Sequence, residues 1–126
     1  MSENSLKKED SILLSIKKLL GVGTEYEVFD TDIVIYINSA LSTLTQMGVG
    51  PTEGFKIKDE DDKWDDFVPE DPRFESIKTY VYLKVKLLFD PPSSSSIMEA
   101  IKETIKEYEW RLNVESELNK EEIQNG

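Results

Sequence analysis

The chain has 126 residues, the size of one domain, and 38% of them are hydrophobic, which is enough to build one compact core. Its formal net charge of −11 disfavours binding to free nucleic acid or to an anionic membrane, because both need a basic surface on the protein. The sequence contains neither histidine nor cysteine, which excludes disulfides, zinc–thiolate sites and the Ser–His–Asp and Cys–His forms of catalysis.

The remaining routes to catalysis have little support in the sequence. The glycine-rich run from Gly48 to Gly54 follows a predicted helix and lacks the Gly-Lys-Ser/Thr sequence of a phosphate-binding loop, so it indicates a turn. The polar N-terminus does not resemble a signal peptide, and no apolar run approaches the roughly 18–20 residues of a membrane span. We therefore expect a protein that is not an enzyme, with no cofactor, no metal ion and no membrane association.

Two helices are predicted in the first half of the chain. The first runs from about residue 10 to residue 20, with Asp10 or Ser11 as its N-cap. Two lysines in its last turn suit the helix dipole and are expected to form a basic spot: Lys17 and Lys18. The second helix begins at Asp30 or Thr31, ends at the glycines that follow Met47, and has one apolar face: Ile33, Ile37, Leu41 and Leu44.

The next segment, residues 54–68, has a different pattern. Phe55 and Ile57 alternate with lysines, which is the periodicity of a β-strand, and a run of acids follows. We predict a short β-hairpin or extended flap with a charged tip between the second and third helices. Trp64 and Phe67 are the side chains expected to anchor it.

Two further helices complete a mainly α fold, predicted as a four-helix bundle. The third runs from residue 72 or 73 to residue 89 and should be central, because apolar residues cover most of its circumference. The fourth is expected to begin at a capping box formed by Ser96 and Glu99. Residues 1–118 should form a single domain and residues 119–126 a flexible acidic tail. The side chains expected in one shared core are Leu41, Ile77, Val81, Ile101 and Ile105.

Charge is strongly segregated along the chain. The segment from Asp59 to Asp71 holds eight acids and one lysine, whereas the third helix carries four basic residues against Glu75 alone. A calcium loop is disfavoured, because Lys63 would occupy a ligand position and Trp64 replaces the required glycine. A solvated loop and a charged contact between subunits both stay open. The residues expected at an interface are Asp59, Asp61, Asp62, Asp65, Lys78, Lys84, Lys86, Trp110 and Arg111.

Four stretches, in this order and spacing, resemble the small head–tail connector proteins, also called adaptor or head-completion proteins, of siphophages and of prophages of Gram-positive bacteria. They are Leu14–Gly21 followed by Phe29–Ile33, Ile37–Pro51, Ile77–Pro92 and Glu109–Asn113. The resemblance implies a helical bundle and a structural role without enzymatic activity. It also implies a homo-oligomeric ring of about a dozen copies beneath the portal protein, through which DNA passes as cargo.

The family resemblance further implies contacts with the portal and other head–tail joining proteins, and a location in the virion neck after assembly in the host cytoplasm. A second interpretation stays open from the composition alone. A small acidic phage protein could act as an interaction protein or inhibitor that mimics nucleic acid. A hydrolase that uses paired carboxylates is the least favoured interpretation, because nothing in their spacing separates them from solvated helix faces.

Overall fold

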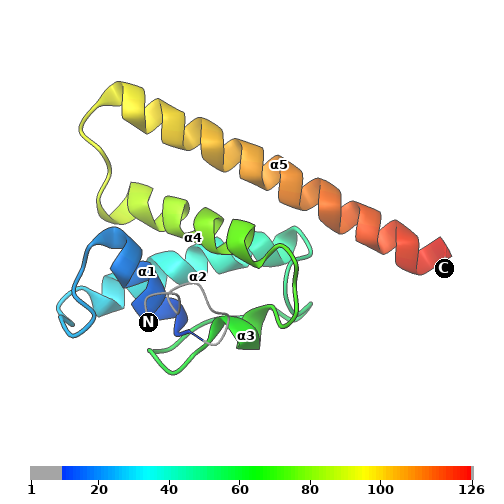
Figure 1. Ribbon diagram of the computed structural model, residues 1–126, viewed down its shortest axis with the longest axis horizontal. Helices are drawn as coiled ribbons and strands as arrows, with labels where there is room; N and C mark the ends of the chain where they lie inside the picture. Colours follow the sequence, from blue (N-terminus) through cyan, green and yellow to red (C-terminus); the bar gives the residue numbers. More distant parts are fainter. Residues whose placement is uncertain (1–9, 126) are drawn as a thin grey trace.

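The computed structural model describes residues 10–125, and the side chains of residues 10–115. This part of the chain is mainly helical, as predicted, and contains no β-strand (Figure 1). A short helix, α3, lies where the hairpin or flap was expected, and the hairpin is not found. The bounds of the helices are α1 Ile12–Leu20, α2 Asp30–Gln46, α3 Trp64–Phe67, α4 Phe74–Phe89 and α5 Ser95–Asn125.

The ends of α1 follow the predicted signals. Ser11 is the N-cap, and its hydroxyl oxygen accepts a hydrogen bond from the Leu14 N–H at 3.2 Å. Gly21 ends the helix with φ +83°, in the left-handed conformation that glycine adopts without a Cβ clash. The helix α2 differs, because its N-cap is Phe29 and no side chain caps it. The Asp30 carboxylate, predicted as a cap, forms an ion pair with Lys17 instead.

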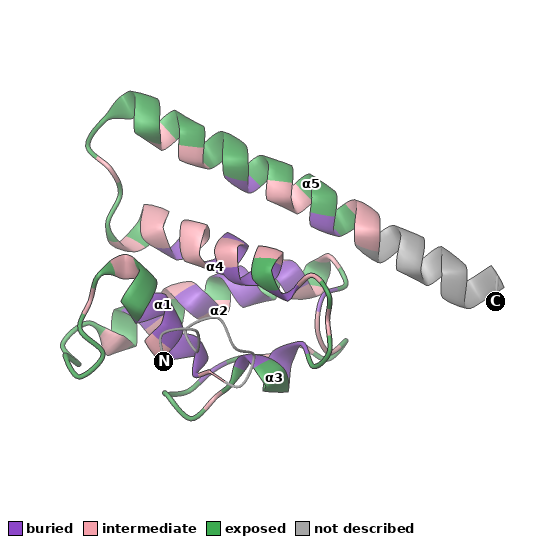
Figure 2. Ribbon diagram, viewed as in Figure 1, coloured by how far each residue is buried: buried purple, intermediate pink, exposed green. Residues whose placement is uncertain are grey.

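The helix α4 is central, as its apolar circumference predicted. It packs against α1, α2 and α5, and most of its residues are buried or half-buried (Figure 2). Four of the five side chains expected in the core are buried, whereas Ile101 is half-buried. The reason is that α5 packs mainly on α4, so only a narrow stripe of α5 is covered. The buried core side chains of α2 and α4 are Ile33, Ile37, Ala40, Leu41, Leu44, Phe74, Ile77, Tyr80, Val81 and Val85.

The long helix α5 begins one residue before the predicted capping box. The Ile97 N–H donates a hydrogen bond to the Ser94 hydroxyl oxygen at 3.3 Å, so Ser94 caps the helix and the prediction of Ser96 with Glu99 is wrong. Ser96 lies inside the first turn and therefore cannot cap it. The helix continues to Asn125, well past the rest of the molecule (Figure 1). Flexibility of residues 119–126 and the boundary at residue 118 stay predictions.

The connection between α2 and α4 is irregular but is tied to the helices at two places. On α2, the Asn38 side-chain amide donates to the Ile57 carbonyl oxygen at 3.0 Å and accepts from the Ile57 N–H at 2.8 Å. Next to α1, the Ile12 N–H donates to the Asp62 carbonyl oxygen, and the Trp64 N–H donates to the Asp10 carbonyl oxygen. A side chain and one β-bridge thus supply the hydrogen bonds that a hairpin would have supplied.

The anchors predicted for this segment are confirmed. Trp64 and Phe67 are both fully buried. The Trp64 indole N–H donates to the Ser15 hydroxyl oxygen at 2.8 Å, and its ring meets Phe74 edge to face with centroids 5.7 Å apart. Gly50 has φ +82°, and a Cβ at that position would lie 2.4 Å from the Phe67 ring, so a side chain there would displace this anchor. The backbone on both sides of the acidic run is therefore held against the body of the protein.

Candidate interaction surfaces

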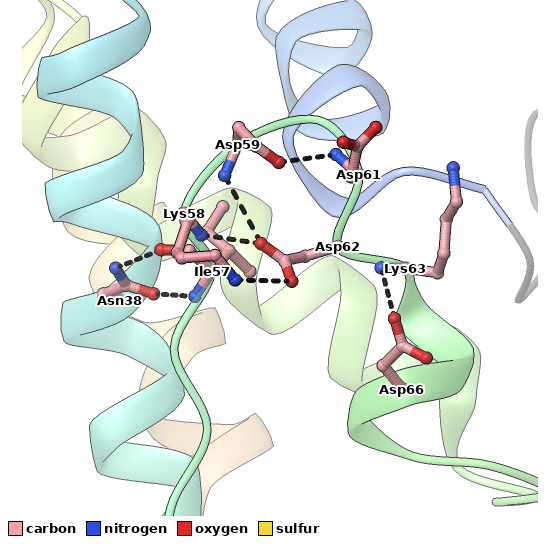
Figure 3. Close-up of polar contacts among 8 residues, drawn as sticks. All are labelled: Asn38, Ile57, Lys58, Asp59, Asp61, Asp62, Lys63 and Asp66. Atoms are coloured by element: carbon pink, nitrogen blue, oxygen red, sulfur yellow. Dashed lines mark hydrogen bonds and ion pairs between the residues drawn. The ribbon is translucent and has the colours of Figure 1, made fainter.

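The acidic loop, defined here as residues 58–63, is shaped by its own carboxylates (Figure 3). One oxygen of Asp62 accepts hydrogen bonds from the N–H groups of Lys58, at 2.6 Å, and Asp59, at 3.3 Å. The Asp59 carboxylate accepts from the Asp61 N–H at 2.9 Å. Two of the four acids predicted at an interface thus hold the loop in place. The Asp59 contact, to the N–H two residues later, is that of an Asx turn.

The other acids point outward. Asp61 and Asp65 are exposed, as is Glu60, which precedes Asp61 in the chain. Within the described residues, no group of three or more acidic side chains is arranged to hold a metal ion. The outward charge is therefore available for contacts with another molecule, whereas the carboxylates of Asp59 and Asp62 accept hydrogen bonds from the backbone and so have a structural task.

A groove of about 540 Å³ lies between the acidic loop and the first turns of α2. Its apolar floor includes Leu13, Val34 and Ile35, and the Ile35 side chain is 57% exposed. Apart from Thr31, the remaining lining residues are five acids and one lysine. They are Glu27, Asp30, Lys58, Asp59, Glu60 and Asp61. We call this feature the acidic groove.

The predicted basic face of α4 is largely engaged within the molecule. Lys78 is buried, and burial lowers the pKa of its ammonium group. The Lys84 ammonium lies 3.9 Å from the Glu109 carboxylate and over the Tyr80 ring, and the Lys86 ammonium lies 3.1 Å from Asp90. These lysines therefore contribute less outward charge than the sequence suggested.

Lys17 also departs from the prediction of a basic surface spot, because its side chain is fully buried. Its ammonium group donates to the carbonyl oxygens of Thr24, at 3.0 Å, and Tyr26, at 2.8 Å. The Asp30 carboxylate lies 2.8 Å from the ammonium group and forms an ion pair with it. Lys17 thus fastens the connection between α1 and α2, and only Lys18 remains exposed.

The contact between α4 and α5 includes one buried polar group. The Tyr80 hydroxyl donates to the Glu109 carboxylate at 2.8 Å, and the Tyr80 side chain is fully buried. Burial first, and the hydrogen bond to Glu109 second, raise the pKa of Tyr80 well above its ordinary value. Because the pKa of Tyr80 is higher in the folded chain, the stability linked to its proton is fully present below the pKa of the unfolded chain. That stability is lost progressively as the pH rises above it.

This shift gives a prediction for alkaline pH. Above about pH 10 the unfolded chain releases the Tyr80 proton while the folded chain keeps it, which costs about 1.4 kcal/mol by pH 11. Tyr80→Phe has no such proton and does not lose this stability. The difference in unfolding free energy between the parent and Tyr80→Phe should therefore shrink by about that amount between pH 9 and pH 11. Urea unfolding at both pH values measures the difference. A deficit that stays constant would contradict the assignment.

The outer face of α5 is open. Trp110 is 68% exposed, and Lys102 and Lys106 are exposed on the same side of the helix, at successive spacings of four residues. Arg111 is also exposed but pairs with Glu107 at 2.9 Å and lies over the Tyr108 ring. Of the two α5 residues predicted at an interface, Trp110 is therefore the less engaged.

Sequence reasoning missed several residues of these surfaces. Glu60 lies within the acidic run and differs from its neighbours only in having a longer side chain. Ile35 carried a usable signal, because it is an apolar residue outside the buried stripe of α2. The lysines at positions 102 and 106 carried none, since exposed lysines are ordinary on an amphipathic helix.

The structure is that of a small helical protein with charged outer surfaces, and none of its described helices is both long and apolar enough to cross a membrane. A family model places it among phage structural proteins. That model is described as "Phage connector protein" and matches residues 12–119, so the chain belongs to the phage connector protein family. Neither the curated proteins nor the solved structures contain a match. Head–tail connectors contact other head and tail proteins, and as a family they are structural.

Proposed function

We propose that the protein is a subunit of a head–tail connector ring that docks beneath the portal and lets DNA pass through its centre. The observation that carries this proposal is the family match over residues 12–119. The ring would contain about a dozen identical copies, contact the portal and other head–tail joining proteins, and belong to the virion neck after assembly in the host cytoplasm.

The charged surfaces suit this task. A closed ring requires that one patch of each copy meets a different patch on its neighbour. Glu60 and Asp61 of the acidic loop and Asp65 of α3 are exposed and are suited to such a contact, because complementary charge sets register between partners. If the loop instead faces the channel, its negative charge would repel DNA and limit adhesion during passage.

Electron microscopy of the protein mixed with the portal of the same phage tests this function. We expect rings coaxial with the portal, and portal without the protein is the control. Assembly should weaken as ionic strength rises, because exposed charges are screened over roughly 8–10 Å at 0.10–0.15 M salt, and should respond little to calcium. A protein that binds no portal under any salt condition would contradict the proposal.

The acidic groove favours one alternative function, an inhibitor that mimics nucleic acid. Its lining gathers five acids around an apolar floor, which a basic DNA-binding protein could recognise. That function requires binding to a DNA-binding protein and competition with DNA, and it requires no ring. Electron microscopy of the protein mixed with the portal therefore distinguishes the two functions.

A further inference from the structure

Two exposed surfaces of this molecule have complementary chemistry. The first is the acidic groove, with its apolar floor and the outward charges of Glu60 and Asp61. The second is the α5 edge, which we define as Lys102, Lys106 and Trp110. On a helix, residues four apart lie about 6 Å from each other along the axis, so these side chains form a continuous line of two ammonium groups and one indole.

The two surfaces cannot meet within one molecule. The helix α5 packs on α4, whereas the acidic loop is bonded to α1 and α2. In Figure 1, α5 and the acidic loop lie on opposite sides of the body, with α4 and α2 between them. A contact between them therefore joins two copies of the chain, head to tail, which is the kind of contact that closes a ring.

The other charged groups nearby do not provide an equally suitable partner for the groove. Lys78 is buried, and Lys84 and Lys86 lie beside Glu109 and Asp90 of the same chain. On α5, the closest carboxylate to the Lys106 ammonium is that of Glu103, at 4.0 Å and with both side chains about three-quarters exposed, so this pair is weak. The Trp110 indole, 68% exposed, has the size and apolar area of an interface anchor.

We propose that the α5 edge of one copy docks in the acidic groove of the next copy. Trp110 covers Ile35 and the apolar floor, and Lys102 and Lys106 lie against Glu60 and Asp61. This interface rests on the ring described under Proposed function and names the surfaces that build it. The interface covers both exposed apolar side chains of these surfaces, Ile35 and Trp110. It also places positive charge beside the carboxylates of Glu60 and Asp61.

Matched charge reversals test the interface in rings assembled on the portal. Lys106→Glu and Asp61→Lys each reverse one charge on a proposed surface. Lys56→Glu and Glu53→Lys make the same changes on exposed residues near the far end of α2 and serve as controls. Placing like charges opposite each other should lower the yield of rings roughly tenfold for each interface variant. The double variant Lys106→Glu with Asp61→Lys should recover most of the yield, which a variant that had merely misfolded would not.

Cysteine cross-linking provides a second measurement, since the natural chain contains no cysteine. Ile35→Cys combined with Trp110→Cys should form a disulfide between copies in the assembled ring. Thr52→Cys combined with Trp110→Cys, with Thr52 exposed beyond the other end of α2, should not. Rings that form normally, without the first cross-link and without sensitivity to the interface reversals, would overturn this interface and leave the proposed function intact. If the parent chain forms no ring on the portal, the proposed function fails and the interface fails with it.

Discussion

Trp64→Ala is expected to lower the free energy of unfolding by about 3–5 kcal/mol, the cost of removing a large aromatic side chain from a core. Trp64 is fully buried, and it joins three parts of the molecule. Its indole N–H reaches Ser15 on α1, its ring meets Phe74 on α4, and its own backbone belongs to α3. Typical domains have only about 5–15 kcal/mol of stability, so this variant should be close to unfolding. Urea unfolding followed by circular dichroism measures the loss.

Trp64→Phe separates the ring from the hydrogen bond. It keeps most of the apolar contact, and the Ser15 hydroxyl still donates to the Ile12 carbonyl oxygen at 3.1 Å. We expect a loss of about 1–2 kcal/mol, from the smaller ring and the missing donor. If Trp64→Ala stays within about 1 kcal/mol of the parent, the connection between α2 and α4 is not fastened by this residue.

Lys17→Met is the second substitution with a large expected effect. Methionine fits a similar space but carries no charge and donates no hydrogen bond. The carbonyl oxygens of Thr24 and Tyr26 therefore lose their donor, and the carboxylate of Asp30 loses its ion-pair partner. Breaking a buried pair by removing one partner costs about 3–5 kcal/mol, and the partial exposure of Asp30 places this case at the lower end. Hydrogen exchange should rise first in residues 22–29, the segment that Lys17 holds.

Lys18→Met is the matched control, because Lys18 is the next residue of α1 and is exposed. Its loss should change stability by no more than about 0.5 kcal/mol. Combining Lys17→Met with Asp30→Asn should recover part of the loss, since the unpaired carboxylate is then removed. Equal stabilities for the two lysine variants would mean that the buried contacts of Lys17 contribute nothing measurable.

The four long helices could be predicted from the sequence because each has its own local signals. Apolar spacing located the buried faces of α2 and α4, and Ser11 and Gly21 located the ends of α1. The segment after α2 misled because Phe55 and Ile57 do alternate as in a strand. The backbone of Ile57 is satisfied by the side chain of Asn38, which lies 19 residues earlier in the chain, and periodicity carries no information about such a partner.

Lys17 and Ser96 illustrate the same limit. A lysine in the last turn of a helix is ordinarily exposed, and the sequence alone did not show that the carbonyl oxygens of Thr24 and Tyr26 fold back onto it. For α5, several consecutive serines offered the same capping chemistry, and only the backbone geometry selected Ser94.

The candidate surfaces were predictable in part. The acidic run was plain in the sequence, and so was the aromatic residue Trp110. The sequence could not show that the carboxylates of Asp59 and Asp62 bind backbone N–H groups of the loop, because that depends on the local backbone. Nor could it show that the groove beside the loop is floored by Ile35, since the loop reaches α2 only through its tertiary attachments.

The attachment of Ile57 to Asn38 also bears on how quickly the chain can fold. The helices α2 and α4 form the largest contact in the molecule, yet the whole segment 47–73 separates them. Bringing two such helices together requires closing a long loop, whose entropic cost grows as about (3/2)RT ln n. Once Asn38 has bound Ile57, the segment is divided into two shorter loops, each of which closes at lower cost. The helices α4 and α5, joined only through residues 90–94, need no such intermediate attachment and can pair by local diffusion of neighbouring segments.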